Sequence, residues 1–331
     1  MRKLFLSISI FCLTLAANAD EGMWLLKELN SQSVARMQEM GFTLPVDQLY
    51  HDTNPSLKDA VVIFGGGCTG VAVSEQGLIF TNHHCGFGSI QRLSSVEHDY
   101  LKDGFVAANQ DDELYADRLT VSFLRSMEEV TDKIIPYLPS VLSEIQRELT
   151  IDSLSNELIK EYENDPFTSA RFVPFYSGNR FYVVLYDVFR DVRLVATPPQ
   201  SVGKFGGDTD NWMWPRHTGD FSVFRVYSDE NNKPANYSDT NKPYKPKYVV
   251  PVSLNGVKEG DFSMTVGYPG STQRYMSSWG IQQRVESENK PRVEVRGVKQ
   301  DIWWEAMTQN DTIRIKYANK YAGSSNYWKN S

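Results

Sequence analysis

A histidine followed directly by a cysteine is the feature of this chain best suited to chemistry. Residues 79–85 read IFTNHHC, so a short apolar run leads into His83, His84 and Cys85. A second cysteine, Cys68, lies seventeen residues upstream in a glycine-rich turn. A disulfide between Cys68 and Cys85 would tie the histidine's loop to the preceding strand and hold a general base still beside a nucleophile. We therefore take His84 as the candidate base.

Three interpretations of this segment stay open on the residues alone. In serine peptidases of the chymotrypsin type, the base directly precedes a cysteine that bridges back to the previous strand, and His84 has this position. An adjacent histidine pair is also compatible with a polar loop tip. The third interpretation, a metal hydrolase with zinc on His83, His84 and Cys85, is disfavoured because adjacent side chains diverge and no Cys-x-x-Cys or His-x-x-x-His spacing completes a tetrahedral site. We expect no metal and no cofactor.

A general-base histidine needs a carboxylate that orients its ring. The segment 205–221, FGGDTDNWMWPRHTGDF, offers Asp208, Asp210 and Asp220. Asp208 and Asp210 fall in a turn rich in glycine and aspartate, where these residues commonly stabilise the turn itself. Asp220 follows a glycine and opens an apolar run, so it can lie at a barrel edge and face another loop. Spacing alone favours Asp220 only modestly.

The elements that must position these residues are mostly short strands. Strands are predicted, from apolar runs bounded by glycine-bearing turns, at 61–64, 69–73, 78–81, 171–175, 181–185, 188–196, 221–227, 248–254 and 263–267. Helices are predicted over 24–40, over 127–164 with breaks at Pro136 and Pro139, and from about residue 278 onward. Short strands around a helical insert predict a mainly β fold with α insertions, built as an antiparallel barrel and not as a doubly wound sheet.

The first nineteen residues have the pattern of a signal peptide. Arg2 and Lys3 precede an apolar run over 4–16 and the small-residue site 17–19. We expect cleavage before Asp20 and export to the periplasm or the cell surface, with no membrane span, because no later segment has about 18 uninterrupted apolar residues. Cleavage would leave two cysteines, enough for one bridge in an oxidising compartment. It would also change the net charge from −7 to −9, which argues against nucleic acid as a partner.

Four segments together resemble the bacterial exported dipeptidyl-peptidases 7 and 11: TNHHCGFGSIQ, GGDTDNWMWPRHTGDFSVFR, VGYPGSTQRY and SSNYWKN. Members of that family are chymotrypsin-clan serine exopeptidases with a large helical domain inserted in a double β-barrel. The resemblance implies that His84 is the general base and that Asp220 orients it. It also implies that Asn211, Trp212 and Asn326 hold the free amino terminus of the substrate. Amide oxygens and an aromatic wall suit an ammonium group.

The resemblance covers residues 20–331, which correspond to the first half of such an enzyme. We therefore expect a signal peptide at 1–19, the N-terminal part of a chymotrypsin-like peptidase domain at 20–278 with a helical insert at about 127–165, and the truncated start of the α-helical domain at 279–331. The double β-barrel would be incomplete. A chymotrypsin-like nucleophile sits in a Gly-x-Ser-Gly turn, and no such run occurs here; Ser89, Ser271 and Ser324 are the nearest imitations.

The sequence thus favours an exported serine dipeptidyl-peptidase that acts on peptides with a free N-terminus, represented by a fragment without its nucleophile. The alternative is a truncated, non-catalytic module that binds peptide N-termini. Homodimers are common in such families, and a homodimer of the full-length enzyme is an expectation of the resemblance alone. The preferred side chain at the second substrate residue, acidic or hydrophobic, is not fixed by these residues.

Overall fold

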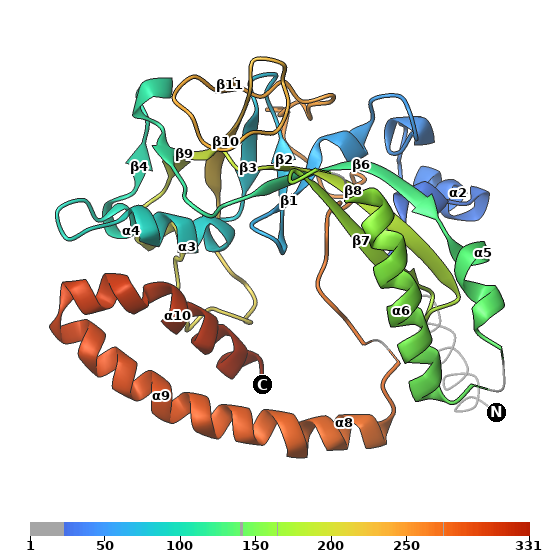
Figure 1. The fold of residues 1–331 in the computed structure, drawn as a ribbon. Coiled ribbons are helices and arrows are strands. Elements are labelled where there is room, and N and C mark those ends of the chain that lie inside the picture. The colour runs from blue at the N-terminus through green and yellow to red at the C-terminus, as the bar shows by residue number, and fades with distance from the viewer. Residues whose placement is uncertain (1–22, 140–141, 164, 274) are drawn as a thin grey trace, which may run out of the picture.

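The computed structural model describes residues 23–139, 142–163, 165–273 and 275–331, so the predicted signal peptide lies outside the described residues. Within them, the main element is one sheet of eleven strands, flanked by helices (Figure 1). Every strand pairing in it is antiparallel. The fold is therefore mainly antiparallel β with helices. None of the helices in the described part of the chain is both long and apolar enough to cross a membrane.

The strands are β1 (Val61–Phe64), β2 (Cys68–Ala72), β3 (Leu78–Thr81), β4 (Phe105–Val106), β5 (Leu114–Tyr115), β6 (Val121–Glu129), β7 (Thr168–Phe175), β8 (Arg180–Phe189), β9 (Val192–Thr197), β10 (Ser222–Ser228) and β11 (Lys242–Pro243). Their order along the sheet is β4-β9-β10-β3-β2-β1-β6-β8-β7, with β11 on β10 and β5 on β9. This order brings the end of β3 next to the start of β10, so the histidine motif and Asp220 lie at the same edge.

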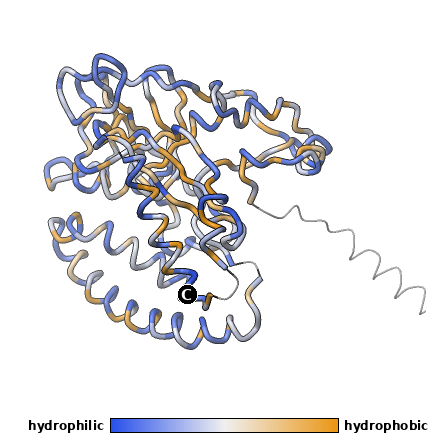
Figure 2. The backbone as a smooth tube through the Cα atoms, turned by 45° about the vertical axis from the view of Figure 1, so that its right-hand side comes forward, coloured by the Kyte–Doolittle hydropathy of each residue, from blue (hydrophilic) through white to orange (hydrophobic). Residues whose placement is uncertain are grey.

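The core lies where β1, β2, β3, β9 and β10 present alternate side chains to one another. Gly70 is required in this packing, because a Cβ there would lie 2.8 Å from Cγ2 of Ile79 on the neighbouring strand. Figure 2 shows the apolar residues concentrated in these strands, whereas the C-terminal helices are of mixed hydropathy. Fully buried members of the core include Val62, Phe64, Ile79, Ile90, Val192, Leu194, Phe224 and Val226.

The helices are α2 (Ser31–Glu39), α3 (His83–Leu93), α4 (Tyr100–Asp103), α5 (Thr131–Ile134), α6 (Glu144–Tyr162), α7 (Gln200–Gly203), α8 (Ser278–Arg284), α9 (Lys290–Gln309) and α10 (Asp311–Asn330). Short 3-10 turns lie at Leu26–Glu28, Val46–Gln48, Leu57–Asp59, Gln110–Asp112 and Ile135–Tyr137, and a π-helical segment, Val285–Asn289, joins α8 to α9.

The predicted helix over 127–164 begins too early. Residues 127–129 belong to β6, where Met127 pairs with Val184 of β8. Cross-strand pairing on a buried neighbour outweighs the helical preference of this short run. The long helix α6 begins only at Glu144, and Ser143 caps it by accepting a hydrogen bond from the backbone N–H of Gln146 at 3.3 Å.

Two predicted strands, 248–254 and 263–267, are absent from the sheet. Neither segment has regular secondary structure or a ladder partner among the described residues. Val250 makes a single backbone hydrogen bond, to the carbonyl of Ala72 at 2.9 Å. Further along, the Leu254 side chain is 95% exposed. A run of strand-forming residues becomes a strand only where a second backbone satisfies its N–H and C=O groups.

The predicted C-terminal helices are present as α8, α9 and α10. The chain leaves the sheet through α8 and α9, turns back at Asn310, and runs along α10 toward α3 (Figure 1). On α10, Ala318 packs in the same core as the strands. The side chain of Gln91 on α3 donates to the carbonyl of Lys316 at 3.1 Å. Helix α10 is thus the part of the helical segment that contacts the sheet beside the histidine motif.

Candidate active site

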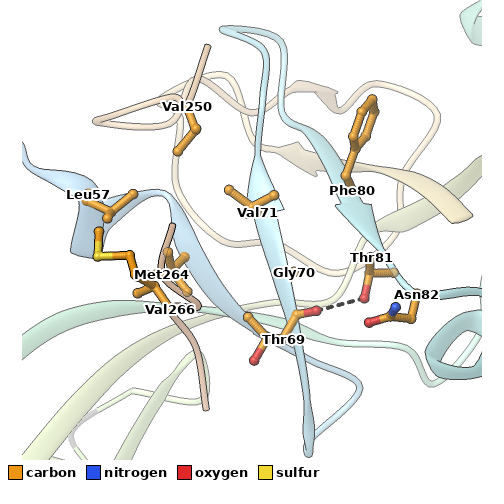
Figure 3. Close-up of a pocket in the computed structure, with 11 residues that line it drawn as sticks. Leu57, Thr69, Gly70, Val71, Phe80, Thr81, Asn82, Val250, Met264 and Val266 are labelled. Atoms are coloured by element: carbon orange, nitrogen blue, oxygen red, sulfur yellow. Dashed lines mark hydrogen bonds between the residues drawn. The ribbon is translucent and has the colours of Figure 1, made fainter. Parts of the chain in front are cut away.

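The histidine motif is held from two sides. Strand β3 ends at Thr81, and α3 begins two residues later at His83. The predicted disulfide is confirmed: Cys68 at the start of β2 is bonded to Cys85 in the first turn of α3, with their Cα atoms 6.0 Å apart. The hydroxyl of Thr81 also donates to the carbonyl of Thr69 at 2.8 Å (Figure 3). The disulfide therefore fixes the first turn of α3 to β2, and the hydrogen bond fixes the end of β3, just before α3, to the same strand.

His84 contacts Asp220 through two hydrogen bonds. Nδ1 of the imidazole lies 2.7 Å from Oδ2 of Asp220, and the backbone N–H of His84 donates to Oδ1 at 3.0 Å. The amide of Asn82 adds a donor to the carbonyl of Asp220 at 3.2 Å and to Oδ2 at 3.3 Å. The His84 side chain is 69% exposed, so its Nε2 edge remains accessible. Of the three candidate aspartates, Asp220 is the one that contacts His84.

The surroundings keep Asp220 ionised. Its partial burial raises the pKa, but the hydrogen bonds from the ring and backbone of His84 and the proximity of that histidine lower it more, so the pKa of Asp220 lies below its usual value. A carboxylate only accepts hydrogen bonds, so the Nδ1 atom of His84 carries the proton. The lone pair of Nε2 is then free to accept a proton from a reactant, which is the state a general base requires.

His83, unlike His84, is buried. Its side chain is 1% exposed, and Nδ1 lies 3.1 Å from the hydroxyl of Thr197 on β9. Burial lowers the pKa of His83 to about 4, so the ring is neutral at physiological pH. The sulfurs of Cys68 and Cys85 lie within 4.8 Å of a ring nitrogen of His84, but the disulfide occupies both sulfurs. The thiolate that a zinc site on this motif would need is therefore not available.

The three residues expected to bind an amino terminus lie together. The amide nitrogen of Asn211 donates to Oδ1 of Asn326 at 3.0 Å, and the indole N–H of Trp212 donates to the backbone carbonyl of Asn326 at 3.1 Å. Asn211 and Trp212 belong to the loop 204–221, which also carries Asp220 near its end, and Asn326 lies on α10. The backbone of Trp212 has φ of 61°, an unfavourable conformation for a bulky residue.

Two cations beside this group were not singled out from the sequence. The guanidinium of Arg216 donates to Oδ1 of Asn211 at 3.3 Å. The ammonium of Lys329 donates to the backbone carbonyls of Asp208 and Thr209. Lys329 follows Asn326 by three residues on α10, a spacing that places both side chains on one face of a helix. That spacing was the available signal in the sequence. The hydrogen bonds of Asn326 and Lys329 show that α10 contacts the loop 204–221 at more than one point.

Ser89 and Ser324, whose sequence surroundings partly resemble a nucleophile motif, do not have the structural surroundings of a nucleophile. Ser89 lies within α3, is 4% exposed, and accepts a hydrogen bond from Arg92 at 2.9 Å. Ser324 is buried on α10. Neither stands in a turn whose backbone N–H groups converge on one point, the arrangement of an oxyanion hole.

An open cavity of about 530 Å³ adjoins the motif (Figure 3). Its walls come from β2, β3 and the two segments that lack ladder partners, and they are mostly apolar. Asn82 lies at its edge and so joins the cavity to the His84–Asp220 pair. The remaining lining residues are Leu57, Val61, Thr69, Gly70, Val71, Phe80, Thr81, Val250, Met264 and Val266.

Comparison with known proteins gives consistent matches along the chain. It is 57% identical over 332 residues to dipeptidyl-peptidase 7 of Porphyromonas endodontalis, covering 100% of this chain and 41% of the relative. It is 43% identical over 329 residues to the Asp/Glu-specific dipeptidyl-peptidase of Flavobacterium psychrophilum, covering 99% and 46%. The crystal structure of Porphyromonas endodontalis DPP11 in complex with the dipeptide Arg-Glu matches with a TM-score of 0.87 and 46% identity, covering 94% of this chain and 45% of that one.

The chain therefore spans less than half the length of these relatives. The family model described as Peptidase S46 matches residues 19–331, which is nearly the whole chain. With the matched relatives and the shared fold, this leaves one assignment: the chain belongs to the peptidase S46 family.

Proposed function

We propose that this chain is the N-terminal half of an exported serine dipeptidyl-peptidase, which removes dipeptides from the free N-terminus of peptides. His84 is the general base, Asp220 orients it, and the nucleophilic serine lies beyond this chain. The observation that carries the proposal is the 2.7 Å contact between Nδ1 of His84 and Oδ2 of Asp220, next to an accessible Nε2. Relatives named dipeptidyl-peptidase 7 and Asp/Glu-specific dipeptidyl-peptidase support the reaction class.

In the proposed reaction, Asp220 keeps the proton of His84 on Nδ1 and stabilises the imidazolium that forms. Nε2 of His84 takes the hydroxyl proton of the serine as this attacks the second peptide bond's carbonyl carbon, and then returns it to the leaving amine. The disulfide and the hydrogen bond between Thr81 and Thr69 limit the movement of the histidine during both transfers.

Asn211, Trp212 and Asn326 form the proposed binding site for the substrate's ammonium group. The side-chain oxygens of both asparagines can accept from it, and the indole of Trp212 offers an aromatic face beside it. The indole of Trp212 is hydrogen-bonded to the backbone carbonyl of Asn326, and the loop that carries Trp212 also carries Asp220 near its end. A fixed ammonium site near the proposed catalytic pair would place the second peptide bond of the substrate at that pair. Peptide bonds farther from the N-terminus would then not be cleaved.

The architecture of the complete protein is part of the proposal. We propose that the sheet is the first barrel of a chymotrypsin-like double β-barrel, with α8, α9 and α10 as the start of the inserted helical domain. Support comes from the relatives, of which this chain covers less than half. It also comes from the segment after Val250, where Val252 and Leu254 are 58% and 95% exposed. Apolar side chains on a backbone without a ladder partner suit a second sheet.

A second candidate function is a module that binds peptide N-termini without cutting them. One observation favours it: the three residues proposed to bind the ammonium group are hydrogen-bonded to one another, whereas no Gly-x-Ser-Gly turn occurs in the sequence. This module would bind peptides with a free amine and reject N-acetylated peptides. Equal binding of the two in calorimetry would contradict it.

The main proposal is tested with the complete reading frame that includes this chain. The purified enzyme is expected to release a fluorophore from dipeptidyl substrates but not from N-acetylated ones. His84→Ala should reduce the rate to background, whereas His217→Ala, which changes an exposed histidine of the loop 204–221, should retain it. A rate for His84→Ala equal to that of the unmodified enzyme would refute the role of His84.

A further inference from the structure

We propose that His83 is a positioning residue: its buried ring acts as a spacer that, through the turn α7, sets where Asp220 meets His84. The inference rests on the proposed function, because it concerns the pair to which that function assigns the proton transfer. It assigns a role to the first histidine of the motif, which otherwise contacts neither the ammonium site nor Asp220 by a hydrogen bond.

The ring of His83 is fixed in one orientation. The hydroxyl of Thr197 donates to the carbonyl of Pro198 at 3.3 Å, so toward His83 it acts as the acceptor and Nδ1 of His83 carries the proton. Phe87, one turn along α3, meets the ring edge-on with centroids 5.6 Å apart. The Nε2 atom is buried and has no hydrogen-bond partner among the described residues. Among the described residues, the ring is therefore held on that side by its packing against Phe87.

One face of the ring lies directly against the backbone of Gly203, the last residue of α7. A Cβ at Gly203 would lie 2.5 Å from Cγ, 2.6 Å from Nδ1 and 2.7 Å from Cδ2 of His83. Carbon atoms in ordinary contact lie about 3.5–4.0 Å apart. The space for this close approach exists only because residue 203 is glycine. The thickness of the imidazole therefore sets the distance between α3 and α7.

The other side of α7 holds the residue before Asp220. The backbone N–H of Gly219 donates to the carbonyl of Val202 at 3.0 Å, and a Cβ at Gly219 would lie 2.8 Å from Cγ1 of Val202. The turn is thus held between the His83 ring and Gly219. Asp220 follows, and its carboxylate returns to the ring and backbone of His84.

These contacts form a closed path from one histidine to the next. The path runs from the ring of His83 through Gly203 and Val202 to Gly219, and back through Asp220 to His84. A change in the distance between His83 and α7 must therefore alter at least one of these contacts. The hydrogen bonds between Asp220 and His84 close this path, and the His84 side chain is 69% exposed.

Three substitutions at His83 separate the spacer from the hydrogen bond. His83→Phe keeps a flat ring and loses the bond to Thr197. His83→Asn keeps a donor for Thr197 and loses the ring, and His83→Ala loses both. In a fourth variant, Gly203→Ala, the new methyl group pushes the ring and the turn apart. Gly67→Ala is the matched control, because it lies in a turn with nothing within 4 Å of its Cβ position.

The first readout is hydrogen exchange at the backbone N–H of His84, measured in the complete enzyme. This group donates to Oδ1 of Asp220. We expect exchange about tenfold faster in His83→Ala, His83→Asn and Gly203→Ala, as for the loss of one hydrogen bond. His83→Phe and Gly67→Ala should match the unmodified chain. Slow exchange in His83→Asn together with fast exchange in His83→Phe would refute the spacer role. It would assign the effect to the hydrogen bond with Thr197.

The second readout is steady-state kinetics of the complete enzyme. A displacement near 1 Å of a reacting group costs on the order of 10² in rate, so kcat should fall about that much in His83→Ala and Gly203→Ala, while KM changes less than about twofold. Asp220→Asn, measured in parallel, separates the two proposals. If Asp220→Asn has unchanged kcat, the proposed function fails; if it is impaired and both spacer variants retain full kcat, the spacer alone fails.

Discussion

Replacing Asp220 with asparagine is expected to move a proton within the imidazole of His84. The carboxylate accepts two hydrogen bonds, from Nδ1 at 2.7 Å and from the backbone N–H of His84 at 3.0 Å. Asparagine has one oxygen and one NH₂ group in the same positions. If the oxygen keeps the backbone N–H, the NH₂ group faces Nδ1, which must then accept. The ring proton moves to Nε2, the atom that we propose receives the proton of the serine.

The size of the effect follows from this exchange of tautomers. The fold and the backbone contact persist, so substrate binding is expected to stay within about twofold. In chymotrypsin-type triads the same change lowers kcat about 10⁴-fold, which corresponds to about 5 kcal/mol in the activation free energy. We expect a loss of this order in the complete enzyme with Asp220→Asn, and no recovery with a substrate that binds more tightly.

Two measurements check this prediction. Nitrogen NMR of His84 in the complete enzyme should show protonated Nδ1 in the unmodified protein and protonated Nε2 in Asp220→Asn. Kinetics of the complete enzyme should show the loss in kcat, with Asp210→Asn as a matched control in the same loop. An Asp220→Asn enzyme with kcat within tenfold of the unmodified one would refute the reasoning, and so would an Asp210→Asn enzyme that is equally impaired.

Three further predictions concern stability and binding. Replacing Cys68 and Cys85 together with alanine opens a loop closed across a separation of 17 residues, so the free energy of unfolding in urea should fall by about 3 kcal/mol; no change would contradict this. The pKa of His83, lowered to about 4 in the fold, lies below its unfolded value near 6.5, so the unfolded chain takes up a proton first as the pH falls. The free energy of unfolding should therefore decrease by up to about 3 kcal/mol as the pH falls from about 6.5 to 4. His83→Phe should remove this part of the pH dependence, and a variant with an unchanged pH dependence would refute the prediction. Asn326→Ala removes the oxygen that accepts a hydrogen bond from Asn211. Calorimetry should then show about tenfold weaker binding of peptides with a free amine. Equal weakening for acetylated peptides would show that the substitution disrupts the structure in general.

The sheet around the histidine could be predicted from local patterns. The runs at 61–64 and 78–81 have the bounds of β1 and β3, because short apolar segments between glycine-bearing turns carry a strong local signal. The runs at 248–254 and 263–267 carry the same signal and form no strand. Strand formation depends on a second backbone, and a single segment of sequence does not contain that information. Residues 127–129 show the reverse case, in which the pairing with β8 overrides a helical preference.

The candidate site was predictable where one residue constrains the next along the chain. The position of His84 before Cys85 indicated both the base and the disulfide. The choice of Asp220 over Asp208 and Asp210 depended on the resemblance to a family, since spacing favoured it only modestly. Lys329 was missed, because a lysine on a helix is normally a solvated side chain and its acceptors lie about 120 residues away. Contacts of that sequence separation are set by the tertiary fold.

Because of the backbone conformation of Trp212, the proposed recognition of a free amine depends on the contact between α10 and the loop 204–221. A left-handed conformation costs an ordinary residue roughly 1–2 kcal/mol, and here the indole gains its compensating bond from Asn326, 114 residues away. Were α10 to come away from the sheet, the loop would relax and the indole would swing aside, although no side chain had been replaced. On mild heating of the complete enzyme, the proposed selectivity for free amines should then be lost at a lower temperature than that at which the strands unfold.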